Sequence, residues 1–536
     1  MSEKKTEGFI KGAMVLMVAN ILVKVIGAVF RVPLTRVVGD YGMGLYSAAY
    51  RYYSLLLTIA TAGFPLAISK MISEARTLGR VQESKRIFRI AFGFCAVLGS
   101  VGTILLIVGS GFLADLANNP EVSTSVIALS PAVLLLSLAA GLRGFFQGRN
   151  NMVPTGLSQV LEALSRLFVG LFFALLFIRI GLADKFVAAG AITGVTVGAG
   201  LSALLLAVLY AVSKKKHAAA DAELLEVSDC RTNGKILKDL LALAIPVMVG
   251  ALVMNLTNTI DLVLVTNRLA AVGYDSYQTT ELFGIYDNYA IPLFNLVPSV
   301  IISLNVSITP VAAAAYARRD MKELHGTIAS SSRLVVMLSL PCAVGIAVLA
   351  NPIISLLFGA GESANIATPV LAILSIASVF LCISSLTSTL LQAIGKPIIP
   401  VITMLAGAVV KVAANYFLIA IPGVELCGAA IGTVLCYVVI TVLNLIFLKK
   451  VTGFSVNLIS NYGRVILSSF VMGILCFGVY LLLNAFVGNT IAMFASVAVG
   501  GVAYVALLFV TGGITKEDIL MLPKGETLAR ILPLKK

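Results

Sequence analysis

The chain has few of the side chains from which metal-dependent or nucleophilic enzymes build their sites. Its only two histidines, His217 and His325, fall in polar segments between apolar runs, so neither a His-based metal site nor a Ser/His/Asp triad can be assembled. The seven cysteines show no C-x-x-C pair and no metal spacing, and they are interpreted as small apolar fillers. No P-loop signature occurs either. The sequence therefore predicts a protein that is not an enzyme and that has no metal or other cofactor.

Charged residues are also scarce, and this scarcity defines the class of protein. Only 12% of the 536 residues are charged and 59% are hydrophobic, whereas a soluble domain averages about 25% charged residues. So much apolar surface cannot be hidden in a water-soluble core. We therefore predict an all-α polytopic membrane protein. About fourteen apolar runs approach or exceed the roughly 20 residues that span a bilayer, at about 9–32, 43–69, 88–112, 124–147, 156–178, 186–212, 239–266, 284–315, 328–357, 366–393, 398–420, 424–448, 464–487 and 490–512.

The basic residues are distributed unevenly over the loops between these runs. With the N-terminus inside, about 30 of the 39 Lys and Arg residues fall in inside loops and about 5 in outside loops. This is the positive-inside bias of a membrane protein with both termini in the cytoplasm. The net charge of +14 is thus a sign of topology. Nucleic-acid binding is not predicted, because the basic residues are scattered over many short loops.

One polar stretch divides the chain. The longest inside loop lies between the sixth and seventh runs, where a link between two six-span halves belongs. The sequence thus predicts an N-terminal six-helix lobe at 1–213, a cytoplasmic inter-lobe loop at 214–238 and a second six-helix lobe at 239–450. Two additional helices and a cytoplasmic tail are predicted at 451–536. The two lobes are expected to be pseudo-symmetric around a central cavity.

Two segments repeat each other. The first reads FFQGRNNMVP and leads to Arg166, and the second reads LLQAIGKPIIP and leads to Lys411. Gln147 plus 245 is Gln392, and Arg166 plus 245 is Lys411. A duplicated membrane domain with paired intramembrane cations is typical of a transporter whose site lies between two halves. We therefore expect both cations to point towards one cavity.

A glycine pattern predicts one close helix contact. Gly190, Gly194 and Gly198 are spaced G-x-x-x-G-x-x-x-G on the sixth run. Small residues at this spacing form a face that another helix can approach closely. We interpret this face as a packing surface.

Charges inside the apolar runs are the candidate functional residues. An intramembrane charge is costly unless it is paired or faces water. The cations are predicted to bind an anionic substrate, and they are Lys24, Arg51, Arg166 and Lys411. The acids are predicted to couple ions or to pair structurally, and they are Glu162, Asp261 and Asp287. Glu162 and Arg166 are spaced i, i+4 on one helix, so an ion pair between them is an open alternative to a substrate role for Arg166.

Several segments resemble a known family over essentially the full length. They include NILVKVIGAVFRVPLTRVVGDYGMGLYSAAYRYYSLLLTIATAGFPLAISKMISEAR near the start and SLNVSITPVAAAAYARRD in the second half. The chain resembles the MurJ/SpoVB-type lipid-linked polysaccharide flippases of the multidrug/oligosaccharidyl-lipid/polysaccharide (MOP) exporter superfamily. The resemblance implies two six-helix lobes that form a V-shaped cavity. It also implies alternating-access transport of a polyprenyl-pyrophosphate sugar, such as a peptidoglycan or polysaccharide precursor.

The resemblance also assigns residues. Lys24 matches a basic residue on the first helix that lines the cavity in the MurJ branch, and Arg51 matches one on the second helix. This chain has Leu57 and Thr58 where MurJ-like proteins tend to carry an arginine pair, which favours the SpoVB-like branch. The implied partners are an anionic lipid-linked glycan and membrane lipids, with a monomer as the expected state. The implied location is the bacterial cytoplasmic membrane.

Two other functions stay open. A cation-coupled multidrug antiporter of the same fold would need intramembrane acids, but the first run offers Lys24 and no acid. A non-transporting membrane scaffold in sporulation or envelope assembly would leave the intramembrane cations dispensable. Since the chain has no nucleotide motif, transport would draw on an ion gradient, the membrane potential or removal of product outside.

Overall fold

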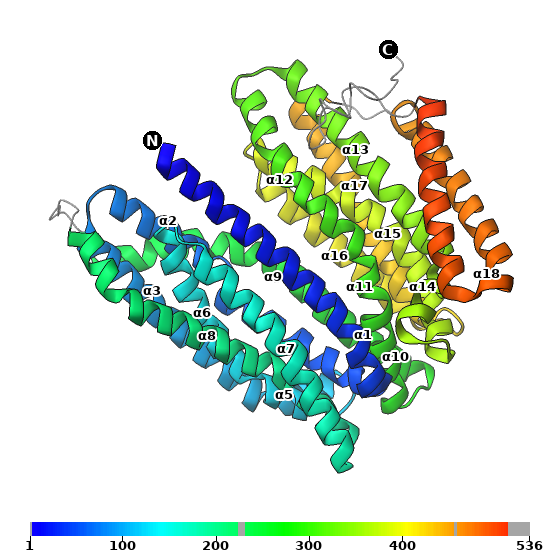
Figure 1. The fold of residues 1–536 in the computed structure, drawn as a ribbon, viewed down its shortest axis with the longest axis horizontal. Helices are drawn as coiled ribbons and strands as arrows, with labels where there is room; N and C mark the ends of the chain where they lie inside the picture. Colours follow the sequence, from blue (N-terminus) through cyan, green and yellow to red (C-terminus); the bar gives the residue numbers. More distant parts are fainter. Residues whose placement is uncertain (1–2, 223–230, 455–457, 513–536) are drawn as a thin grey trace. The chain divides into compact units, whose positions relative to one another are not determined.

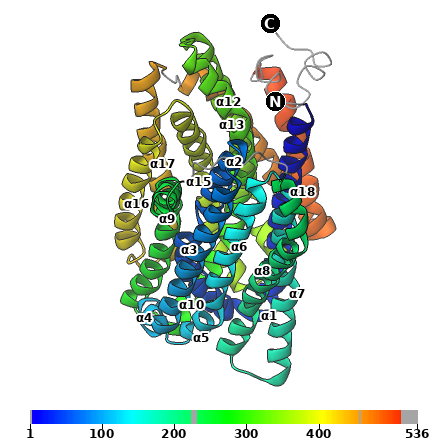
Figure 2. The same ribbon diagram turned by 90° about the vertical axis from the view of Figure 1, so that its left-hand side faces the viewer.

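The structure, a computed structural model, describes the backbone of residues 3–222, 231–454 and 458–512. Within these ranges some side chains of the first helix, among them that of Lys24, lie outside the described residues. The described backbone is almost entirely helical and contains no strand. Within each part of the chain the long helices run side by side (Figure 1, Figure 2). The predicted all-α class of the fold is confirmed.

The chain forms two compact units. The first comprises residues 1–270 with 274–284, and the second comprises 271–273 with 285–536. The helices that make up the first unit are α1 (Glu3–Thr61), α2 (Phe64–Thr77), α3 (Val81–Val108), α4 (Ser110–Leu116), α5 (Val122–Leu129), α6 (Pro131–Gly148), α7 (Val153–Ile180), α8 (Asp184–Ala222), most of α9 (Asn233–Val272) and most of α10 (Ser276–Ile285).

The second unit begins with a π-helix. Its elements are η1 (Tyr286–Ala290), α11 (Ile291–Phe294), α12 (Leu296–Ala317), α13 (Met321–Val348), α14 (Ala350–Phe358), α15 (Glu362–Ala393), α16 (Ile398–Leu418), α17 (Glu425–Thr452) and α18 (Leu458–Thr511). Helix α15 packs against α12, α13 and α17, and α16 packs against α17. A cluster of buried apolar side chains from α12, α13 and α15 forms part of the core of this unit.

Helix α9 packs within the first unit. Its Asn255 Nδ2 donates to Thr58 Oγ1 at 2.8 Å, and its Asn267 Nδ2 donates to the Leu116 carbonyl oxygen at 2.8 Å. At Gly63 a Cβ would lie 2.5 Å from the Ala244 carbonyl oxygen, so only glycine allows this approach. The boundary between the compact units therefore follows α9, and the division into two six-helix lobes and two additional helices stays a prediction.

Two glycines divide the longest helices. Gly39 in α1 has φ 76° and ψ 169°, and Gly488 in α18 has φ 78° and ψ 167°. Glycine adopts such positive-φ conformations at little steric cost. Each of these elements is thus a pair of helices that meet at a sharp bend. Both glycines fall in gaps between consecutive apolar runs of the sequence.

Eleven helices in the described part of the chain are long and apolar enough to cross a membrane. The last two predicted runs lie together in one of them, on either side of the bend at Gly488. The run at 284–315 is not among the eleven, and the structure divides it among α10, η1, α11 and α12. The predicted count of about fourteen spans, and the cytoplasmic placement of both termini, stay predictions.

The predicted glycine face lies against α7. A Cβ on Gly194 would lie 2.6 Å from the Gly170 nitrogen and 2.9 Å from the Arg166 carbonyl oxygen. A Cβ on Gly198 would lie 2.8 Å from the Glu162 carbonyl oxygen. The predicted close helix contact is confirmed, and it occurs at the turns of α7 that carry Glu162 and Arg166.

The two repeated segments have the same helical register. Gln147 and Gln392 are the second-to-last residues of α6 and α15. Arg166 lies thirteen residues after Val153, the first residue of α7, and Lys411 lies thirteen residues after the first residue of α16. Each segment is therefore a helix, a short turn and a second helix with a cation at the same depth.

Candidate functional site

Two arginines share one glutamate in the first unit. Arg143 comes from α6, and Glu162 and Arg166 lie one turn apart on α7. Arg143 Nη2 donates to Glu162 Oε2 at 3.1 Å. Arg166 Nη2 lies 3.6 Å from Glu162 Oε1, within ion-pair distance but beyond a good hydrogen bond. The cluster thus holds two positive charges and one negative charge.

Arg143 is well anchored. Its Nε donates to Ser158 Oγ at 3.1 Å, and its Nη2 also donates to Ser202 Oγ of α8 at 3.0 Å. Its guanidinium therefore joins α6, α7 and α8 through one carboxylate and two hydroxyls. Because these contacts occupy much of its hydrogen-bonding capacity, the role of Arg143 in the cluster is structural.

Arg166 is held much more loosely. Its Nη1 lies 3.5 Å from Tyr50 Oη, and its Cζ lies 5.5 Å from the centre of the Tyr50 ring. The buried Nε of Arg166 has no hydrogen-bond partner among the described residues. Its side chain is 26% exposed. A guanidinium presents five N–H donors, so Arg166 retains capacity to bind an acceptor.

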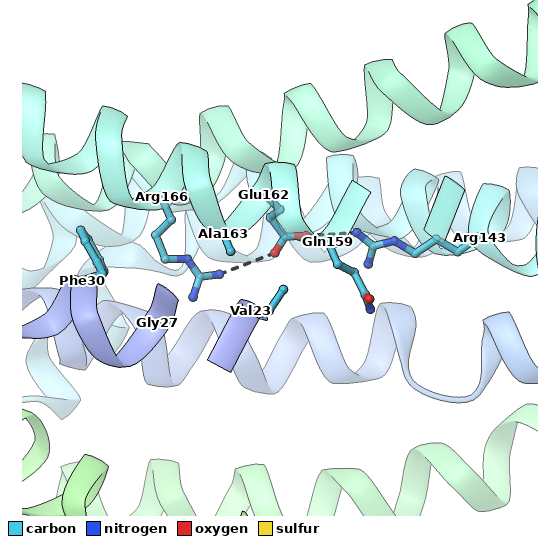
Figure 3. A pocket seen from close by; sticks show the side chains of 8 residues that line it. All are labelled: Val23, Gly27, Phe30, Arg143, Gln159, Glu162, Ala163 and Arg166. Atoms are coloured by element: carbon cyan, nitrogen blue, oxygen red, sulfur yellow. Dashed lines mark hydrogen bonds and ion pairs between the residues drawn. The ribbon is translucent and has the colours of Figure 1, made fainter. Parts of the chain in front are cut away.

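A cavity of about 180 Å³ lies beside this cluster, between α7 and α1 (Figure 3). The side chains of α6 and α7 that line it approach the helix turns of α1 that carry Val23 and Gly27. Gln159 adds a buried Oε1 that has no hydrogen-bond partner among the described residues. The full lining is Val23, Gly27, Phe30, Arg143, Gln159, Glu162, Ala163 and Arg166.

A second cavity of about 210 Å³ lies on the other side of Arg166. It shares Arg166, Gly27 and Phe30 with the first cavity, and its remaining lining is Arg31, Leu34, Met43, Tyr46 and Tyr50. Arg166 therefore has access to both spaces. Cationic donors in a low-dielectric cavity attract oxyanions such as phosphate, and an arginine can bind them with two parallel hydrogen bonds.

The other predicted site residues of the first unit lie around this cluster. Lys24 is on α1 between Val23 and Gly27, which line the first cavity, but its side chain is outside the described residues. Arg51 is half-buried, and its carbonyl oxygen accepts from Ser54 Oγ at 2.9 Å. Asp261 is a buried residue of α9. Neither Arg51 nor Asp261 lines the two cavities.

Lys411 and Asp287 belong to the second unit. Asp287 is buried in η1. Lys411 is buried, 7% exposed, on a face of α16 that also carries Thr403 and Gly407. This face packs on α17, since a Cβ on Gly407 would lie 2.5 Å from the Ile440 side chain. The facing arrangement of Arg166 and Lys411 across a cavity stays a prediction.

The predicted ion pair between Glu162 and Arg166 is present, but the sequence pattern did not single out Arg143. Arg143 lies near the end of the apolar run at 124–147, where a cation is easily assigned to the adjacent loop. Its position inside the run was the sequence signal that could have identified it as an intramembrane charge. The partners Ser158 and Ser202 carry no sequence signal, because hydroxyls are common in membrane helices. In the described part of the chain, no group of three or more His, Cys, Asp or Glu residues is arranged to hold a metal ion.

Family models and curated relatives match this chain along most of its length. The model described as "Polysaccharide biosynthesis protein" matches residues 9–315, and the MatE model matches 288–417. Stage V sporulation protein B of Bacillus subtilis (strain 168) is 24% identical over 96% of this chain and 98% of its own length. Lipid II flippase MurJ of the same organism is 24% identical over 92% of this chain and 94% of its own length.

Solved structures show the same fold. The lipid II flippase MurJ in an inward closed conformation matches with a TM-score of 0.69 and 15% identity, over 93% of this chain and 98% of that one. An inward-facing MATE family multidrug resistance transporter of the MOP superfamily matches with a TM-score of 0.62 and 16% identity, over 80% of this chain and 94% of that one. The first family model covers more than half of the sequence, and eleven helices in the described part of the chain are long and apolar enough to cross a membrane, so the chain is a multi-pass membrane protein that belongs to the polysaccharide biosynthesis protein family.

Proposed function

We propose that this protein is a flippase that moves an anionic lipid-linked sugar across the bacterial cytoplasmic membrane by alternating access. The observation that carries the proposal is the state of Arg166. This cation is only loosely paired with Glu162, has a buried Nε without a hydrogen-bond partner among the described residues, and lines two cavities. A site of this kind is suited to a phosphate or pyrophosphate oxygen.

The cations proposed to bind the cargo indicate the chemistry of that cargo. A pyrophosphate would bind to Arg166, with Lys24 and Arg51 of α1 and Lys411 of α16 as further proposed substrate-binding residues. A polyprenyl tail would stay in the lipid, and the sugar would occupy aqueous space. The relative named as a lipid II flippase supports this class of cargo. The proposed role is transport without covalent chemistry, powered by an ion gradient, the membrane potential or removal of product.

A cation-coupled antiporter is a second candidate. The MatE model matches residues 288–417, and the buried acids Asp261 and Asp287 are the kind of group that couples transport to protons or sodium. A transporter of cationic drugs would bind cargo through these acids and would not depend on Arg166. The two candidates therefore predict different sensitivities to the same substitutions.

A flipping assay in proteoliposomes separates them. The protein is reconstituted with a fluorescent polyprenyl-pyrophosphate sugar, and the fraction accessible to an external quencher is followed with time. We expect Arg166→Gln to abolish flipping, while Arg179→Gln, an exposed control on the same helix α7, leaves the rate unchanged. Full activity of Arg166→Gln at normal expression, or efflux of cationic dyes that requires Asp261, would overturn the proposal.

A further inference from the structure

The glutamate of the cluster is bound unequally by its two arginines. Glu162 accepts a 3.1 Å hydrogen bond from Arg143, but it stays 3.6 Å from Arg166. Both Glu162 and Arg166 lie on α7 at a spacing that allows a direct pair. Their loose contact therefore reflects where the carboxylate is held, and the contacts that hold it come from outside α7.

Arg143 is the residue that holds the carboxylate. Its own position is set by Ser158 Oγ on α7 and Ser202 Oγ on α8, at 3.1 and 3.0 Å. Ser202 can reach it because α8 approaches α7 closely at Gly198, one turn earlier, where a side chain would meet the Glu162 backbone. Arg143 is thereby fixed from two helices and draws Glu162 towards α6.

A carboxylate that moved fully onto Arg166 would compete with the cargo. Carboxylate and phosphate bind a guanidinium through the same pairs of N–H donors, so only one of them can occupy a given pair. In the observed arrangement Arg143 occupies one oxygen of Glu162, and the donors of Arg166 stay accessible from the cavities. Glu162 remains near enough to Arg166 to weaken the binding of the anion by Arg166 and to favour release of the anion.

We propose that Arg143 is a positioning residue that keeps Glu162 from closing on Arg166 and thereby sets the affinity of the site for its anionic cargo. This inference rests on the proposed function, because it assumes that Arg166 binds the anion. In this arrangement Glu162 acts as an internal competitor of the cargo. The strength of that competition is set by Arg143, Ser158 and Ser202.

The test is a rescue experiment on the full-length protein in nanodiscs. Binding of a polyprenyl pyrophosphate is measured by a fluorescence or calorimetric titration. The uncharged polyprenyl alcohol is the control ligand. Arg143→Gln should weaken pyrophosphate binding about tenfold, which corresponds to about 1.4 kcal/mol. Glu162→Gln should tighten it. The double variant Arg143→Gln/Glu162→Gln should bind at least as tightly as the unsubstituted protein, because no competing carboxylate remains.

A purely structural role for Arg143 gives a different pattern. In that case the double variant would bind as weakly as Arg143→Gln, or more weakly, and the inference would be overturned. Binding by Arg143→Gln equal to that of the unsubstituted protein would overturn it as well. Ser202→Ala removes one anchor of Arg143 while leaving all three charges. It should weaken binding by a smaller factor, and Glu162→Gln should reverse that loss too. If Arg143→Gln does not fold, Ser202→Ala and the double variant Ser202→Ala/Glu162→Gln decide the question. Absence of any effect of Ser202→Ala would then count against the inference.

Arg166→Gln separates this inference from the proposed function. If Arg166→Gln leaves pyrophosphate binding unchanged, the proposed function itself fails. If Arg166→Gln abolishes binding but neither double variant restores it, the proposed function stands and only the positioning role of Arg143 is wrong.

Discussion

The two repeated segments have the same register but hold their helices together by different chemistry. In the first, the charged groups of Arg143 and Glu162 join α6 and α7, and Arg143 also reaches α8. In the second, the neutral amide of Asn444 on α17 performs this task. Its nitrogen, with two N–H donors, lies 2.9 to 3.3 Å from three acceptors on α15, namely the Ser384 carbonyl oxygen, Thr387 Oγ1 and Ser388 Oγ. Its oxygen accepts from Thr403 Oγ1 of α16 at 2.7 Å.

The offset of 245 gives, for each residue of the first segment, the corresponding residue of the second segment. Arg143 corresponds to Ser388, and Glu162 corresponds to Gly407. The second segment therefore lacks both members of the charged pair, and its cation Lys411 is buried against α17. The network around Asn444 contains no charged group, whereas the network of the first segment contains two arginines and one glutamate. The difference teaches that equal position in a duplicated fold does not give equal surroundings, because the residues that pack around each cation differ between the copies.

The largest effect is expected from a charge reversal at Lys411. A buried anion in place of a buried cation should destabilise the fold by at least about 3 kcal/mol. Thermal unfolding in nanodiscs measures this, with Arg318→Glu as the control, because Arg318 is exposed. Lys411→Met keeps the length of the side chain without its charge. If Lys411→Met folds normally but fails to flip the sugar, Lys411 acts with Arg166 as a substrate-binding residue despite its burial, whereas normal flipping would confine the proposed anion site to the first unit.

Removal of Asn444 should have the next largest effect, and on stability more than on transport. Interhelical hydrogen bonds in membrane proteins average about 0.6 kcal/mol, so the loss of two donated bonds and one accepted bond in Asn444→Ala should cost roughly 2 kcal/mol. Thr403→Val removes the accepted bond and should cost about a third as much. Chemical denaturation in mixed micelles gives both values, and the flipping rate of the folded fraction should be unchanged. A loss of cargo affinity in Asn444→Ala would show that the neutral network also serves the site.

An effect on stability smaller than that of Asn444→Ala is expected at the contact between α7 and α8. Gly198→Ala places a methyl group 2.8 Å from the Glu162 carbonyl oxygen, and the shift of α8 that relieves this clash should cost about 1 kcal/mol. Because Ser202 would move with α8, pyrophosphate affinity should fall as well. Gly200→Ala is the matched control, since its Cβ has ordinary contact with Leu135 at 3.7 Å. Equal affinities of the two variants would show that the approach of α8 does not influence the site.

Much of this organisation could be predicted from the sequence. Scarce charge and long apolar runs predicted a helical membrane protein, and the spacing of Gly190, Gly194 and Gly198 predicted the close contact of α8. The i, i+4 spacing of Glu162 and Arg166 predicted their ion pair. These features depend on residues that are close together in the chain, where helical periodicity is enough to place one side chain relative to another.

The features that the sequence pattern missed all join separate helices. The role of Arg143 depends on three helices meeting at one guanidinium, and the burial of Lys411 depends on which face of α16 packs against α17. None of these follows from composition or spacing, because they arise from contacts between residues that are distant in the chain.

The sequence alone determined that this protein is a membrane protein, that two of its segments are copies, and that each copy carries one cation within its apolar run. Those properties follow from hydrophobicity and from comparing the chain with itself. Only the tertiary structure decided how each of the two cations is surrounded. Arg166 lies near Glu162 of α7 and Tyr50 of α1 and lines two cavities, whereas Lys411 is buried on a face of α16 that packs on α17. The surroundings of a charge depend on which helices pack against it, and the sequence pattern does not specify that packing.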